Sequence, residues 1–225
     1  MRQIPLPIAA LPAPAFDNFM PGANAPAIAH LEGLSAPAAP VYLWGVSGSG
    51  KTHLMQALVH RYADQGLRSG WFSAADAAPW PSDEAWALIA IDNCDALDAD
   101  QQHAAFSLFV DAATRGIPLI AAGRVPPVDL AVREDLRTRL GWGHVFAIRP
   151  LDEPEARAAL RREADRRMLF FSDDVMDYLL TRFARDLKHL MALLDRLDEF
   201  SLSTKRAITV PLLKKMLAEE GGAAS

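Results

Sequence analysis

The sequence predicts an α/β fold, in which a parallel sheet is covered by helices on both faces, followed by a small α-helical domain. Short continuous apolar runs, typical of strands buried on both faces, alternate with helically spaced apolar residues over the first 150 residues. From about Leu151 the apolar runs disappear and only helical spacing remains. A chain of 225 residues is long enough for one large and one small domain, each with a buried core.

The elements of the α/β region follow in chain order from these patterns. We expect strands over 41–44, 69–73, 87–91 and 117–122, and helices over 25–32, 53–65 and 101–114. The second and third helices end at Gly66 and Gly116, since glycine adopts the left-handed conformation that commonly follows a helix. Strands that alternate with helices in this way favour a parallel sheet.

The helical region begins with clear start signals. Asp152, Ser172 and Thr209 are the predicted N-cap residues of the first, second and last helices. We expect helices over 153–167, 173–183, 186–201 and from 209 onward. The basic face of the first helix is interleaved with acidic residues, which predicts a solvated, salt-bridged surface. The predicted organisation is a flexible tail over 1–14, an α/β domain over 15–150, a helical domain over 151–220 and a disordered tail over 221–225.

Composition and charge exclude several classes of protein. With 51% hydrophobic and 23% charged residues, the bulk of the chain is globular. The formal net charge of -5 argues against a broad nucleic-acid surface, so direct DNA binding should be weak or absent. The one cysteine, Cys94, excludes an internal disulfide and a cysteine-based zinc site, which suits the cytoplasm. No apolar stretch reaches the roughly 18 residues of a membrane span, so we expect no membrane partner.

The strongest functional motif lies between the first predicted strand and the helix after it. It consists of Gly45, Val46, Ser47, Gly48, Ser49, Gly50, Lys51 and Thr52, and it fits G-x-x-x-x-G-K-[ST] at every fixed position. The glycines let backbone N–H groups surround phosphates, and the following helix adds its positive N-terminal end. Lys51 would contact the β- and γ-phosphates, and Thr52 would bind Mg²⁺. The motif therefore predicts a site for a nucleoside phosphate and Mg²⁺.

A carboxylate follows the strand over 87–91. Asp92 stands where an aspartate can hold Mg²⁺ through water. Many ATPases place a second acid directly after it to polarise the attacking water, but this chain has Asn93, which cannot act as a base. Asp95 could substitute for that acid or could cap a helix. Nucleotide binding is thus better supported than rapid hydrolysis.

With the loop, the Asp92 strand and the helical domain in this order, the chain resembles AAA+ ATPases of the DnaA clan over nearly its whole length. Within the clan it resembles the Hda family, whose small helical domain is a lid. The segment from Phe16 and Phe19 to Asn24 resembles the clan's wall of the adenine pocket. The resemblance to DnaA ends with the lid, so we expect no counterpart of its DNA-binding domain. The resemblance implies ADP or ATP as the ligand, with Mg²⁺.

The resemblance also supplies a candidate arginine finger. The stretch over 135–143 resembles the segment in which an arginine projects toward the nucleotide of another subunit, here DnaA bound to ATP, and Arg139 takes that position. A guanidinium at the γ-phosphate stabilises transition-state charge. The alternatives are Arg137 as the finger, or Arg139 as a surface residue ion-paired with Asp135 or Glu134.

Two further family positions are altered. Lys188 falls where the lid usually carries the sensor-2 arginine, and lysine keeps the charge but loses the forked geometry. The sensor-1 position expects a polar residue at the end of the fourth strand, and residues 121–123 offer none. Together with Asn93, these departures imply weak intrinsic hydrolysis and a stably bound nucleotide. A homo-oligomer is compatible with the resemblance, because neighbours complete AAA+ sites.

The N-terminal tail resembles the Hda-type hexapeptide that binds the sliding clamp, the β subunit of DNA polymerase III. It consists of Gln3, Ile4, Pro5, Leu6, Pro7 and Ile8. Its prolines stiffen an extended peptide, so less entropy is lost when Leu6 and Ile8 enter an apolar groove.

Two functional hypotheses follow from these features. The first is a regulatory adaptor that binds adenine nucleotide and the clamp, and that stimulates ATP hydrolysis by DnaA, so that replication initiation is inhibited. The second is an autonomous ATPase, similar to DnaA or a helicase loader, that acts on DNA. The hexapeptide, the absent second acid and the acidic net charge favour the adaptor.

Overall fold

The computed structural model describes residues 13–183, 187–204 and 206–221. The chain divides into two compact units, an α/β unit over Ala13–Pro150 and a helical unit that begins at Leu151. Each unit has its own buried core.

The α/β unit contains a five-stranded parallel sheet, which confirms the predicted α/β class. The strands are β1 (Val41–Trp44), β2 (Arg68–Ser73), β3 (Trp86–Asp92), β4 (Leu119–Gly123) and β5 (His144–Ala147), in the order β2-β3-β4-β1-β5. The central strand β1 pairs with β4 from Val41 opposite Ile120 to Trp44 opposite Gly123. Because all the strands are parallel, the carboxyl ends of β1, β3 and β4 lie at one edge of the sheet.

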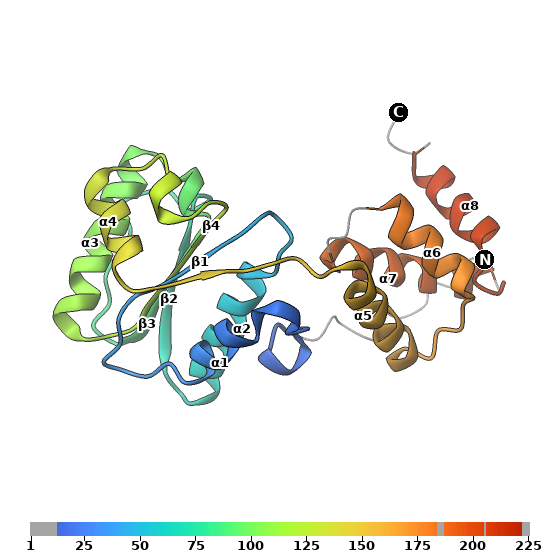
Figure 1. Cartoon of the computed structure of the whole chain (residues 1–225), viewed down its shortest axis with the longest axis horizontal. Coiled ribbons are helices and arrows are strands. Elements are labelled where there is room, and N and C mark those ends of the chain that lie inside the picture. The colour runs from blue at the N-terminus through green and yellow to red at the C-terminus, as the bar shows by residue number, and fades with distance from the viewer. Residues whose placement is uncertain (1–12, 184–186, 205, 222–225) are drawn as a thin grey trace. The chain divides into compact units, whose positions relative to one another are not determined.

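Helices cover both faces of this sheet (Figure 1). They are α1 (Ala25–Glu32), α2 (Lys51–Asp64), α3 (Ala99–Arg115) and α4 (Glu134–Trp142). Successive strand residues point to opposite faces. Val41 and Leu43 therefore join the core under α1 and α2, whereas Tyr42 joins the core under α3 and α4. Short 3-10 turns connect these elements: η1 (Phe16–Asn18), η2 (Gly22–Asn24), η3 (Cys94–Ala96) and η4 (Pro127–Asp129).

Helix α4 was not predicted from the sequence. It buries only Leu136 and Leu140, one turn apart, and no side chain caps its N-terminus. Nine residues with two apolar anchors give a weak periodic signal, so the helix owes its stability to packing against α3 and η4.

The helical unit contains α5 (Glu153–Arg166), α6 (Asp173–Arg182), α7 (Leu187–Thr204) and α8 (Val210–Gly221). Asp152 caps α5 as predicted: its Oδ1 accepts from the N–H of Glu155 at 2.8 Å. Ser172 is the N-cap residue of α6, as predicted, although its side chain makes no capping hydrogen bond. The core of the unit is leucine-rich and includes Leu160, Leu179, Leu193, Leu194, Leu197 and Leu213.

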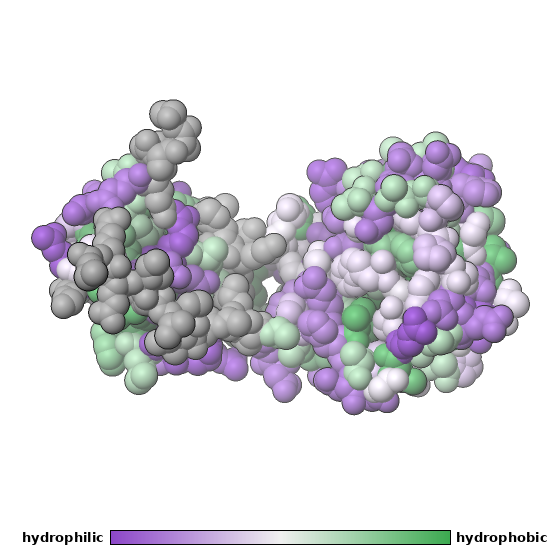
Figure 2. Space-filling model, turned by 180° about the vertical axis from the view of Figure 1, so that it is seen from behind, coloured by the Kyte–Doolittle hydropathy of each residue, from purple (hydrophilic) through white to green (hydrophobic). Residues whose placement is uncertain are grey.

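The predicted salt-bridged face of α5 is confirmed. Arg157 pairs with Asp177, Arg161 with Asp173, and Arg167 with both Glu163 and Asp195. Figure 2 shows hydrophilic and hydrophobic side chains interspersed over the visible surface. Among the residues that the structure describes, no helix is both long and apolar enough to span a bilayer.

Candidate functional site

The glycine-rich loop joins the carboxyl end of β1 to the start of α2. Gly48 and Gly50 have φ angles of 77° and 98°, a backbone conformation that residues other than glycine rarely adopt. The N–H of Gly45 donates to the carbonyl of Gly123 at 3.3 Å, which ties the loop to the end of β4. The loop therefore starts between two strand ends and leads directly into the N-terminus of α2.

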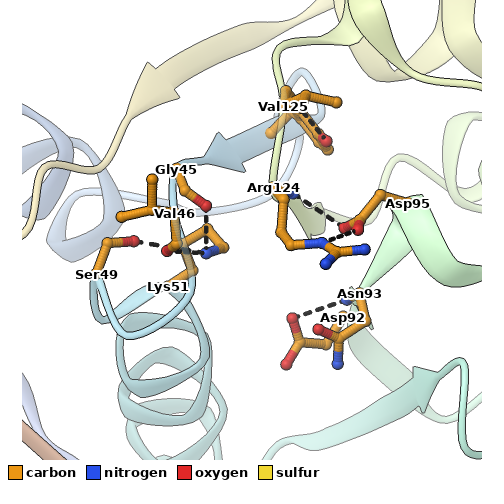
Figure 3. A network of polar contacts seen from close by, with 10 residues as sticks. Gly45, Val46, Ser49, Lys51, Asp92, Asn93, Asp95, Arg124 and Val125 are labelled. Carbon is orange, nitrogen blue, oxygen red and sulfur yellow. Dashed lines mark hydrogen bonds and ion pairs between the residues drawn. The ribbon is translucent and has the colours of Figure 1, made fainter. Parts of the chain in front are cut away.

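Lys51 folds back into this loop (Figure 3). Its ammonium donates to the carbonyls of Gly45 at 2.7 Å and Val46 at 2.9 Å, and the residue is only 8% exposed. Burial lowers the pKa of Lys51, while the carboxylates of Asp92 and Asp95 act in the opposite direction. A positive charge is thus held inside the loop, where phosphate oxygens could replace the two carbonyls as its partners.

Thr52 and Asp92 meet at the first turn of α2. The hydroxyl of Thr52 donates to Oδ2 of Asp92 at 2.7 Å, although the residues lie 40 positions apart. Oδ1 of Asp92 accepts from the N–H of Asn93 at 2.8 Å, and Asp92 is 4% exposed. A hydroxyl and one carboxylate are the protein ligands that Mg²⁺ typically uses when phosphates and water complete its shell. Within the described residues there is no cluster of three or more His, Cys, Asp or Glu for a cage made by the protein alone.

An ion pair beside this site was not predicted from the sequence. Asp95, in η3, accepts from the backbone N–H of Arg124 at 2.9 Å and pairs with its guanidinium. The expectation that Asp95 caps a helix is wrong, because Asp98 is the N-cap of α3. Asp95 and Arg124 are 29 positions apart, so only the adjacency of β3 and β4 brings them together.

Comparisons with known proteins agree with this geometry. A family model described as "Hda, lid domain" matches residues 152–217, which is most of the helical unit. An uncharacterized protein of Haemophilus influenzae is 30% identical over 230 residues, covering 96% of this chain and 98% of the relative. Domain III of the replication initiation protein DnaA from Thermotoga maritima has a TM-score of 0.77 at 16% identity, over 94% of this chain and 98% of that one. The chain is an Hda-like, DnaA-related AAA+ protein.

A second solved structure, AMPPCP-bound DnaA from Aquifex aeolicus, has a TM-score of 0.69 at 20% identity, over 84% of this chain and 66% of that one. The likeness to both structures shows the AAA+ fold.

In this Hda-like protein the segment before α1 lies beside the phosphate loop. The ring of Phe19 is so close to Gly50 that an added Cβ there would come within 2.5 Å of it. Phe19 also packs on His53 of α2, with ring centroids 5.4 Å apart, and Nε2 of His53 donates to the carbonyl of Ala15 at 3.0 Å. Phe16 packs on the core under α1 and α2. Phe19 therefore lies against the loop, where a nucleobase wall was predicted, whereas Phe16 belongs to the edge of the core.

Asn24 has a bracing position. It is 2% exposed, its amide donates to the carbonyl of Arg149 at 2.9 Å, and its Oδ1 accepts from the N–H of Arg149 at 2.8 Å. Both polar groups are therefore engaged with the backbone, and Asn24 fixes η2 against the end of the α/β unit.

Arg139 lies on the last turn of α4 in the Hda-like protein. The alternative of an ion pair with Asp135 is not seen, because Asp135 pairs with Arg133 at 2.7 Å. Arg139 makes no ion pair within the part of the chain that the structure describes, and it lines an open hollow with Phe106 and the exposed Trp142. Its guanidinium is thus available at the surface.

The remaining predicted positions are the hexapeptide, the C-terminal tail, Lys188 and the sensor-1 segment. The hexapeptide over 3–8 and the tail over 222–225 lie outside the described residues, as does the side chain of Lys188. Residues 121–123 are fully buried in β4 and offer no polar side chain, in agreement with the sequence. The next residue along is Arg124.

Proposed function

We propose that this Hda-like protein binds ADP or ATP with Mg²⁺ through the loop over 45–52. The observation that carries the proposal is the buried ammonium of Lys51 inside the loop, with Thr52 joined to Asp92 beside it. Lys51 supplies charge to the phosphates, and Thr52 and Asp92 hold the metal, which neutralises phosphate charge when bound. AMPPCP is bound by the structurally similar DnaA of Aquifex aeolicus, which supports an adenine nucleotide.

We infer that intrinsic hydrolysis is weak. Asn93 follows Asp92 and cannot act as a general base, and its left-handed backbone (φ 56°) turns the chain away from the strand. Asp95 is the nearest alternative acid, but its carboxylate is engaged by Arg124. The bound nucleotide would then serve mainly to stabilise the protein and its working conformation.

We propose further that the protein stimulates ATP hydrolysis by DnaA in the cytoplasm, and so restrains replication initiation. Arg139 would enter the nucleotide site of DnaA, where its charge lowers the barrier for phosphoryl transfer. The hexapeptide over 3–8 would bind the β clamp and bring the protein to DNA. Its support is the sequence resemblance alone.

The proposal is tested by measuring turnover of DnaA–ATP with clamp loaded on DNA. We expect the wild-type protein to stimulate turnover and Arg139→Ala to reduce the stimulation at least about 100-fold, given the usual contribution of an arginine finger. Lys51→Ala should also fail, whereas Gln3→Ala should lose only the part that depends on the clamp. Arg137→Ala removes the same charge from the same helix and tests the alternative: loss of stimulation in Arg137→Ala but not in Arg139→Ala would make Arg137 the finger.

Two outcomes would overturn the proposal. Equal stimulation by wild type, Arg139→Ala and Gln3→Ala would exclude the adaptor. Strong DNA-dependent turnover by the protein without DnaA would instead identify an autonomous ATPase.

A further inference from the structure

The chain just after β4 is fixed beside the phosphate loop. The carbonyl of Gly123 accepts from the N–H of Gly45 at 3.3 Å, and the carbonyl of Val125 accepts from the hydroxyl of Tyr42 at 3.0 Å. Tyr42 is fully buried in β1, so the side chain that holds Val125 is itself fixed by the core. The residue between the two anchors is Arg124.

Asp95 orients the side chain of Arg124. Its carboxylate accepts from both the backbone N–H and Nε of Arg124, and its side chain is 11% exposed whereas that of Arg124 is 66% exposed. The two Nη groups of Arg124 make no hydrogen bond within the described residues. The ion pair thus uses one edge of the guanidinium and leaves the outer edge open to an anion.

The open edge lies where the end of a triphosphate would be. Figure 3 shows Arg124 between the phosphate loop and Asp95, on the side of the site where Asp92 stands. Arg124 and Asp95 both act electrostatically on the ammonium of Lys51, which places the pair within reach of the charges of the site. Lys51 contacts the β- and γ-phosphates in such loops, so the region beyond it is that of the terminal phosphate.

We propose that Arg124 binds the terminal phosphate of a nucleoside triphosphate on the open edge of its guanidinium, and that the carboxylate of Asp95 on the other edge weakens this contact by partly neutralising the charge. The ion pair then sets the preference of the protein between nucleoside di- and triphosphates. A diphosphate ends before Arg124, whereas the terminal phosphate of a triphosphate shares the guanidinium with Asp95, each anion on its own edge. The inference rests on the proposed nucleotide site and adds the residues that decide which nucleotide fills it.

The experiment is calorimetric titration of the full-length protein with MgADP and with MgATP, compared as the ratio of the two dissociation constants. Arg124→Ala should weaken MgATP about 10- to 100-fold relative to MgADP, the usual size of one charged hydrogen bond. Asp95→Asn should shift the ratio in the opposite direction, toward MgATP, by about the same factor. When Asp95→Asn is added to Arg124→Ala, the ratio of the two dissociation constants should stay at its value in Arg124→Ala, because the effect of Asp95 passes through Arg124.

Matched controls separate this contact from a change of net charge. Arg68 pairs with Asp83, and its side chain is 65% exposed, nearly the same as that of Arg124. Arg68 lies at the amino end of β2, however, whereas the phosphate loop lies at the carboxyl ends of the strands. Arg68→Ala and Asp83→Asn should leave the ratio unchanged. Melting curves of all the variants report whether each is folded.

The outcomes distinguish this inference from the function on which it rests. If Lys51→Ala abolishes binding but Arg124→Ala weakens both nucleotides equally, the nucleotide site stands and the role of Arg124 is wrong. An equal effect of Asp95→Asn with and without Arg124 would also overturn the role given to Asp95. If the wild-type protein binds neither nucleotide, the proposed function itself fails.

Discussion

At the scale of single residues, His53 joins the segment before α1 to helix α2. Its Nε2 donates to the carbonyl of Ala15, and its ring packs on Phe19. Burial lowers the pKa of His53, because the charged imidazolium loses hydration that the hydrogen bond to Ala15 replaces only in part. The folded protein therefore holds this histidine in its neutral form more strongly than the unfolded chain does.

The free energy of unfolding should consequently fall on acidification. An unfolded histidine binds its proton near pH 6.5, whereas folded His53 binds it only at lower pH. The contribution is thus complete above about pH 6.5 and is lost as the pH falls toward the folded pKa. Urea unfolding at pH 7.5 and 5.5 should show a smaller loss of stability for His53→Gln than for the wild type. The slope should not vanish, because burial and then the charge of His144 also lower the pKa of His30.

Equal losses of stability in wild type and His53→Gln would contradict this account of His53.

At the scale of elements, the turn into α2 depends on Gly50. This residue is left-handed, and the ring of Phe19 fills the space that a Cβ would need. Gly66 follows the other end of the same helix and is also left-handed (φ 75°), but nothing lies within 4 Å of an added Cβ there. The two glycines share the backbone requirement and differ in what surrounds them.

Gly50→Ala should therefore weaken nucleotide binding at least about tenfold, since it strains the loop and displaces Phe19. Gly66→Ala is the control: it should lower the free energy of unfolding by about 1 kcal/mol through the left-handed backbone and leave nucleotide affinity unchanged. Titration and urea unfolding of both variants measure these effects. Similar nucleotide affinities for the two variants would show that the contact with Phe19 is unimportant.

At the scale of the whole molecule, the two units have separate cores. Leu160 is completely buried in the helical unit, and Leu58 is completely buried in the α/β unit. All five tryptophans of the chain lie before Pro150, so tryptophan fluorescence reports only the α/β unit, whereas circular dichroism of the backbone reports both.

Leu160→Ala should destabilise the helical unit by about 2–5 kcal/mol, the usual range for a buried leucine. In thermal unfolding of Leu160→Ala, we expect the circular dichroism transition to shift to lower temperature, while the midpoint temperature measured by tryptophan fluorescence is unchanged. Leu58→Ala should move the fluorescence midpoint instead. If Leu160→Ala shifts both signals together, the two units unfold as one.

Most of the fold could be predicted because its signals are local. Short apolar runs predict the buried strands. The capping box of Asp152 and Glu155 spans four residues and marks the start of α5. The residues of the loop over 45–52 are also consecutive in sequence, so the motif can be recognised without a structure. Helix α4 escaped prediction because two buried leucines are too few to define a period.

The sequence by itself determined the α/β class, the phosphate loop and the candidate arginine on 135–143, since each depends on neighbouring residues. Only the tertiary structure decided that Thr52 meets Asp92, that Asp95 holds Arg124 and that Asp135 is taken by Arg133 rather than by Arg139. The first two of these contacts join residues 40 and 29 positions apart. Which strand ends become neighbours depends on the β2-β3-β4-β1-β5 order, and that order is set by the packing of the whole sheet.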